Sequence, residues 1–195
     1  MTAAVELHAC EQGRDGRDGF EDSSAWRNVR ELLLPPAHAH VTGTALRLGT
    51  PYVDALTGPV DRARLYGAIA PPIGTYCRVY AVLAPADRDA VRAGGVAAET
   101  IRGHTLVVRG RYRSSPDDPW TSFTWRSDAR RAVELEAVDP STGEHPLGLN
   151  KPDGQTMLLI DKKLSGKVFD VPVDADDAGD RVLDNLADTL RMYTY

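Results

Sequence analysis

Thr75-Tyr76-Cys77-Arg78-Val79-Tyr80-Ala81-Val82-Leu83 is the clearest strand signal in the chain, and the rest of the predicted fold is built around it. Its β-branched and aromatic residues suit a pleated surface, and their alternation predicts that Cys77, Val79, Ala81 and Leu83 share one face. The residues before it, Pro71-Pro72-Ile73-Gly74, have the composition of a turn. We therefore expect a long strand that enters the core directly after a turn.

Short alternating segments recur on both sides of this strand, with turn residues between them. The segments that we expect to form strands are 2–10, 41–48, 52–56, 65–70, 104–112, 120–125, 132–138, 155–162 and 191–195. We expect 120–125 and 132–138 to pair as a hairpin, whereas 24–34 suits a short helix or a strand equally well. Only 178–190 has helical spacing, with aspartates in its first turn. The pattern predicts one all-β domain over 1–195, an antiparallel sandwich or barrel with one short C-terminal helix.

Charge and hydrophobicity limit the classes of partner and the location that we expect for this protein. The chain has 195 residues and a net charge of -5, with scattered arginines and no basic run, so we expect no nucleic-acid partner. We expect no transmembrane segment, because no stretch of about 20 apolar residues occurs. The N-terminus lacks the pattern of a signal peptide, yet a strand begins by residue 3, as in a chain whose leader has been removed.

Two cysteines, Cys10 and Cys77, lie far apart in the sequence. The pair suits one disulfide in an exported protein, or two buried thiols in a cytosolic one. A disulfide closing a loop of that length would stabilise the fold by roughly 4 kcal/mol.

The histidines are the candidate metal ligands. His38 and His40 follow a double proline at i, i+2 spacing, so an extended backbone would place both imidazoles on one face. His8 lies two residues before Cys10 and is the next candidate, with His104 as the alternative third ligand. Imidazole suits copper, zinc, nickel and iron, and a linear pair suits Cu(I). The alternatives are a surface strand that carries two histidines without a metal, or, if both thiols are reduced, a closed zinc site that includes Cys10 and Cys77.

The sequence gives less support to a catalytic site, a calcium site or an aromatic binding surface. No G-x-S-x-G motif and no glycine-rich phosphate loop occurs, so we expect no enzyme activity. The acidic run over 174–180 suits a helix N-terminus better than a calcium site. Trp26, Trp120 and Trp125 suit core and rim positions, or alternatively a surface that binds a sugar or a protein partner.

Three stretches carry a family resemblance: Val5-Glu6-Leu7-His8-Ala9-Cys10, Pro72-Ile73-Gly74-Thr75-Tyr76-Cys77-Arg78-Val79, and 180–190, which contains Leu183-Asp184-Asn185-Leu186-Ala187. Together they resemble the MbnP-like periplasmic copper-binding proteins and related exported β-sandwich lipoproteins. The resemblance implies an immunoglobulin-like sandwich, export to the periplasm or cell surface, and copper held by histidines. The chain departs from the family in having two cysteines where better-defined members have four.

From these observations we expect a non-enzymatic, extracytoplasmic copper-binding protein. Its ligands would be His38, His40 and His8, and a Cys10–Cys77 disulfide would brace the fold. A redox or metal-delivery protein would be its partner. The alternative expectation is a metal-free adhesion, carbohydrate-binding or protein-binding module.

Overall fold

The computed structural model describes residues 2–10, 47–48, 51–53, 64–87, 90–92, 98–139, 142–149, 156–162 and 166–194. Strands dominate these residues and lie in largely antiparallel sheets, so the prediction of an all-β fold is confirmed. The segment 24–34, Trp26, His38 and His40 lie outside the described residues. No helix in the described part of the chain is long and apolar enough to cross a membrane.

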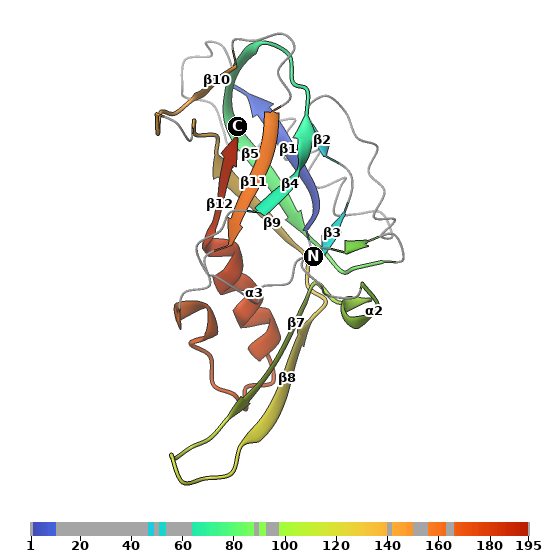
Figure 1. Cartoon of the computed structure of the whole chain (residues 1–195), viewed down its shortest axis with the longest axis vertical. Helices are drawn as coiled ribbons and strands as arrows, with labels where there is room; N and C mark the ends of the chain where they lie inside the picture. The colour runs from blue at the N-terminus through green and yellow to red at the C-terminus, as the bar shows by residue number, and fades with distance from the viewer. Residues whose placement is uncertain are drawn as a thin grey trace, which may run out of the picture.

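The strand predicted over 75–83 is confirmed as β5 (Gly74–Leu83), which lies at the centre of a seven-stranded sheet (Figure 1). One edge of β5 pairs with β1 (Thr2–Ala9). The other edge pairs with two strands in turn along its length, β10 (Leu147–Leu149) at residues 74–76 and β9 (Arg131–Glu136) at residues 78–83. Three short strands complete the sheet beyond β1: β2 (Arg47–Leu48), β3 (Tyr52–Val53) and β6 (Val91–Arg92).

The buried face of β5 follows the predicted alternation except at Cys77. Val79, Ala81 and Leu83 are at most 2% exposed and belong to the main core. The pairing with β1 shifts register between His8 and Ala9, beside Cys77, so that Tyr76 rather than Cys77 takes the next core position. The prediction that Cys77 continues this face is therefore wrong, because a bulge places two residues of one strand against one of its partner.

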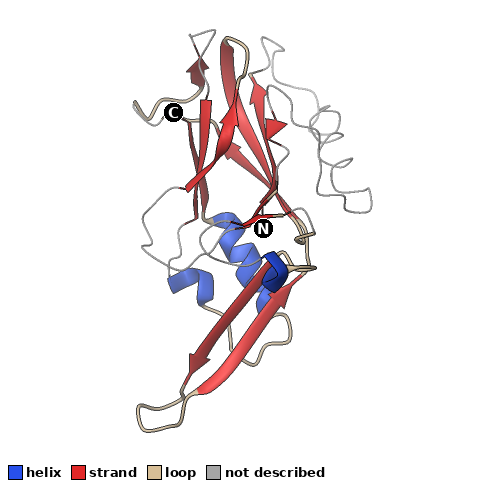
Figure 2. Cartoon of the chain, turned by 45° about the vertical axis from the view of Figure 1, so that its right-hand side comes forward, coloured by secondary structure: helices blue, strands red, loops and turns tan. Residues whose placement is uncertain are grey.

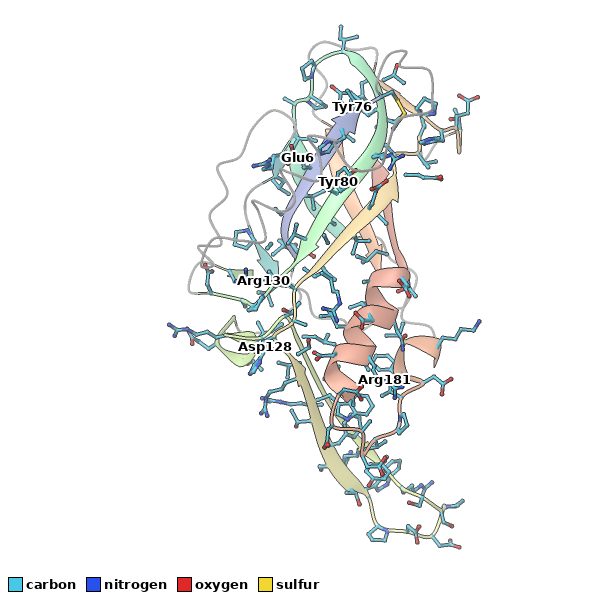
Figure 3. The ribbon with its side chains drawn as sticks, turned by 180° about the vertical axis from the view of Figure 1, so that it is seen from behind. Glu6, Tyr76, Tyr80, Asp128, Arg130 and Arg181 are labelled. Atoms are coloured by element: carbon cyan, nitrogen blue, oxygen red, sulfur yellow. A yellow bond between two sulfur atoms is a disulfide. The ribbon has the colours of Figure 1, made fainter. Side chains whose placement is uncertain are left out.

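A second sheet, of three antiparallel strands, lies across the first (Figures 1 and 3). It consists of β4 (Arg64–Ile69), β11 (Thr156–Lys162) and β12 (Leu190–Thr194). The sheets touch where β2 meets β4 and where β9 meets β12. At the first contact the packing is tight, since a Cβ added to Gly67 of β4 would lie 2.7 Å from the Leu48 side chain.

A long hairpin of β7 (Leu106–Tyr112) and β8 (Thr121–Ser127) extends away from the two sheets (Figure 2). The prediction that 120–125 pairs with 132–138 is wrong, because β8 pairs with β7 while β9 pairs with β5. The two-proline loop between β7 and β8 reverses the chain, whereas residues 128–130 carry it from the hairpin into the first sheet.

The predicted late helix is confirmed as α3 (Ala178–Asp188), which packs on the hairpin (Figure 1). Val182, Leu183 and Leu186 form its buried stripe. Two shorter turns of helix, α2 (Ala98–Ile101) and η1 (Gly166–Phe169), were not expected.

Candidate functional site

The residues around His8 lie on the outer face of the first sheet. Val5 and Leu7 of β1 point into the core and are 1% exposed. Glu6 and His8, which alternate with them along the strand, therefore point to the opposite face. Across β5, Glu6 is paired with Tyr80 and His8 with Arg78. Figure 3 shows Glu6 and Tyr80 on these neighbouring strands.

These side chains form a connected polar group. The Nε2 atom of His8 lies 3.7 Å from Oε1 of Glu6, and its ring meets the Tyr80 ring edge-on, with centroids 4.5 Å apart. The second oxygen of Glu6 accepts a hydrogen bond from Nε of Arg47 in β2, at 2.7 Å, and forms an ion pair with Nη2 of the same guanidinium, at 2.5 Å. Glu6 therefore connects His8 to the strand that comes directly after the segment containing His38 and His40.

The environment of His8 favours the neutral imidazole. Burial lowers the pKa of His8 below its usual value of 6.5; Glu6 opposes this shift and Arg47 adds to it. A neutral imidazole keeps the nitrogen lone pair that a transition metal requires, so a proton competes weakly for this site near neutral pH. About a fifth of the side chain remains exposed, 22%, so a ligand can reach it.

The predicted disulfide between Cys10 and Cys77 is confirmed, with Cα atoms 4.9 Å apart. It joins the end of β1 to β5 within one sheet, whereas the disulfide of antibody domains joins two sheets. The two sulfurs are bonded to each other and are not available as the thiolates that the zinc alternative requires. A metal near His8 would therefore be held by nitrogen or oxygen ligands.

His38 and His40 lie outside the described residues, so their position relative to His8 stays a prediction. Both flanks of their segment are described. Cys10 is tied to β5 by the disulfide, and Arg47 is paired with Glu6 in strand register and through its guanidinium. Within the described residues alone, no group of three or more His, Cys, Asp or Glu side chains could hold a metal ion.

The remaining histidines lie elsewhere. Nδ1 of His145 is 3.1 Å from the Ala137 carbonyl oxygen. His104 follows α2, and its Nδ1 is buried without a hydrogen-bond partner among the described residues. Neither His104 nor His145 belongs to a described strand that pairs with β1, whose described partners are β2, β3 and β5. The expectation of a third ligand therefore rests on His8.

Of the acidic and aromatic residues that the sequence singled out, Asp180 and Trp125 have structural contacts, whereas Trp120 is exposed. Asp180 accepts a hydrogen bond from the Ser127 hydroxyl at 2.5 Å, which supports a structural role for the start of α3. Trp125 is buried, and its Nε1 donates to the Val173 carbonyl at 3.1 Å. Trp120, in contrast, is 56% exposed at the end of the hairpin, and the Arg113 guanidinium lies 4.8 Å from its ring centroid.

Sequence reasoning identified His8 but not the residues around it. The alternation of β1 already placed Glu6 on the face of His8, so that neighbour could have been found. Tyr80, Arg78 and Arg47 come together with His8 only through strand pairing, which no local pattern specified.

The chain was compared with known proteins by sequence family, by curated sequence and by structure. Neither family models, nor curated proteins, nor solved structures gave a match.

Proposed function

We propose that the protein is a non-enzymatic, extracytoplasmic copper-binding protein whose ligands are His8, His38 and His40. One observation carries the proposal: both flanks of the segment that contains His38 and His40 are anchored beside His8. The disulfide holds one flank at Cys10, and the Arg47–Glu6 pair holds the other. The same Glu6 lies against the His8 imidazole.

Chain length is compatible with this site. Arg47 is the seventh residue after His40, and an extended chain of that length spans at most about 25 Å. The imidazoles of His38 and His40 can therefore reach His8 without displacing either anchor. Three imidazoles, with Glu6 as an oxygen donor or as a hydrogen-bond partner of His8, make a donor set that suits copper.

The disulfide supports the assignment to an oxidising compartment, where such bonds persist. The resemblance to MbnP-like proteins implies the periplasm or cell surface, with a redox or metal-delivery protein as partner. We also propose the immunoglobulin-like form of the sandwich. Its support is Tyr76, one residue before Cys77, whose hydroxyl donates to the Pro72 carbonyl at 2.7 Å, much like the tyrosine corner of such folds.

Copper titration tests the proposal. The metal-free protein is titrated with Cu(I) and Cu(II) beside His38→Ala/His40→Ala, His8→Ala and the control His145→Ala. We expect one tight copper in the wild type and the control, loss of tight binding in the double variant, and weakening of about tenfold or more in His8→Ala, because one ligand contributes at least about 1.4 kcal/mol in this range. Unchanged stoichiometry in the double variant, or no tight copper in the wild type, contradicts the proposal.

A second candidate function is a binding module that uses no metal. The observation that favours it is the exposed Trp120, because tryptophan is enriched among the residues that carry most of the energy at binding surfaces. Trp120→Ala would remove binding of a carbohydrate or protein partner and leave copper binding unchanged, so the two functions are separable by experiment.

A further inference from the structure

The hairpin of β7 and β8 has two chemically different faces. Its inner face packs on α3 and carries Trp125 and the Phe123 ring, whose centroids lie 4.4 Å apart. Its outer face carries exposed arginines, which strand register places side by side. Arg109 is opposite Thr124, Arg111 is opposite Ser122, and Arg126 is opposite Val107. We call Arg109, Arg111 and Arg126 the arginine face.

Among the described residues, the arginine face has no ion pair, in contrast to five other arginines of this protein. Arg47, Arg78, Arg102, Arg131 and Arg181 each pair with a carboxylate. Among the residues that the structure describes, no carboxylate lies within ion-pair distance of Arg109, Arg111 or Arg126, and all three are exposed. The Cα atoms of Arg109 and Arg111, two residues apart on one strand, are about 7 Å apart, so their like charges repel one another unless an anion lies between them.

The arginine face continues to the tip of the hairpin. Arg111 and Arg113 approach the Trp120 ring, with guanidinium carbons 6.0 Å and 4.8 Å from its centroid. Arg113 also donates to the carbonyl of Pro116, which holds it at the ring. The result is a line of guanidinium groups, exposed Ser and Thr hydroxyls, and one exposed aromatic ring.

This concentration of positive charge opposes the charge of the chain. Residues 106–127 carry four arginines and two aspartates, whereas the whole chain has 28 acidic and 23 basic residues. The basic character is therefore local to the hairpin, which projects away from the sheets (Figure 2). A local patch of this kind selects an anionic ligand by charge complementarity.

We infer that the arginine face and Trp120 bind an acidic polysaccharide, one whose sugars carry carboxylate or sulfate groups. The inference deepens the second candidate function, on which it rests, and is independent of copper. Guanidinium groups bind planar oxyanions through paired hydrogen bonds, the Ser and Thr hydroxyls suit sugar hydroxyls, and the Trp120 ring suits the apolar side of a sugar.

Two other anionic partners fit less well. Protein interfaces have an apolar centre, whereas the arginine face has only the half-buried Val107 between its charges. Single-stranded nucleic acids stack on successive aromatic rings, and here Trp120 is the one large aromatic side chain exposed on the described hairpin. An extended chain of charged sugars matches both the spacing of the arginines and the single ring.

The test measures binding of the full chain to four probes: heparin, which is sulfated, polygalacturonate, which is carboxylated, neutral dextran, and double-stranded DNA. The variants are Arg109→Gln/Arg111→Gln, Trp120→Ala, and the control Arg181→Gln on α3, an arginine paired with Asp177. All are exposed substitutions, and circular dichroism with urea titration verifies that each folds.

We expect salt-sensitive binding to heparin or polygalacturonate, and the preferred probe identifies sulfate or carboxylate as the recognised group. The arginine double variant should bind about tenfold or more weakly with a shallower dependence on salt, and the control should bind like the wild type. Trp120→Ala should weaken polysaccharide binding but leave any DNA binding unchanged. Binding to dextran that is lost only in Trp120→Ala overturns the inference but is consistent with the metal-free binding module. No binding to any probe, tighter binding to DNA, or equal loss in Arg181→Gln also overturns the inference.

Discussion

At the scale of single residues, the strand β1 sets the surroundings of His8, the proposed copper ligand. The pleat directs it to the outer face, the Tyr80 ring shields one side, and Glu6 lies beside Nε2. Arg47 neutralises the carboxylate that would otherwise stabilise a protonated imidazole. Burial consequently dominates, and the lowered pKa keeps His8 neutral.

The stability of the metal-free protein should therefore fall as the pH falls below about 6.5, the pKa of a histidine in the unfolded chain. The unfolded state then binds a proton that the folded state does not, so protons favour unfolding until the pH reaches the lowered folded-state pKa. Above about 6.5 both states are neutral and His8 adds no pH dependence. Urea titrations between about pH 8 and roughly pH 5, with a chelator present, measure the slope.

His8→Gln removes this contribution, so its stability should depend less steeply on pH than that of the wild type. His145→Gln is the matched control, since His145 is exposed and lies outside the strands. Identical slopes for the wild type and His8→Gln would show that the folded state does not disfavour the charged imidazole.

At the scale of elements, α3 and the hairpin form one packed unit. Val182 and Leu183 of the helix are buried in the main core, and the Ser127 hydroxyl of β8 bonds to Asp180. Arg131, at the start of β9, also pairs with Asp184. The closest approach is at Gly179, where an added Cβ would lie 1.9 Å from the Arg126 carbonyl oxygen. The helix thus rests directly on the backbone of β8 and holds the arginine face outward.

Gly179→Ala should destabilise the protein by about 2 kcal/mol or more, because neither the helix nor the strand backbone can yield without losing packing. Helix propensity alone predicts the opposite, a gain of about 1 kcal/mol. Gly148→Ala in β10 is the control, since an added Cβ there meets no atom within 4 Å. Urea unfolding measures both variants. A Gly179→Ala protein as stable as the wild type would contradict the close contact.

At the scale of the whole molecule, the disulfide closes a long loop. Cys10 and Cys77 are 67 residues apart, and the segment with the predicted ligands His38 and His40 lies within that loop. The bond therefore acts on stability and on the proposed copper site together. In the chain-entropy account it stabilises the fold by restricting the unfolded chain.

Cys10→Ala/Cys77→Ala should lower the free energy of unfolding by roughly 4 kcal/mol, as expected for a loop of this length. Reductant should destabilise the wild type by a similar amount and leave the double variant unchanged. Urea unfolding gives the free energies, and mass measurement of alkylated protein reports the thiols. A double variant as stable as the oxidised wild type would show that the bond contributes nothing.

Much of the fold was predictable from local pattern. Alternation predicted β1, β5 and β7, helical spacing predicted α3, and the count of cysteines allowed the disulfide. Alternation also separated His8 from the core, because a pleated strand sends neighbouring side chains to opposite faces whatever its partners. These properties belong to residues close in sequence.

Strand pairing and register, in contrast, emerge only when distant segments meet in the folded chain. Which strand β8 joins, the bulge that gives Tyr76 the core position, and the meeting of Glu6 with Arg47 all depend on residues far apart in sequence. So does the arginine face, since the exposure of Arg126 beside Arg109 requires both the hairpin register and α3 on the opposite side. Local sequence specifies the period of a strand, whereas its neighbours are selected by the burial of the whole chain.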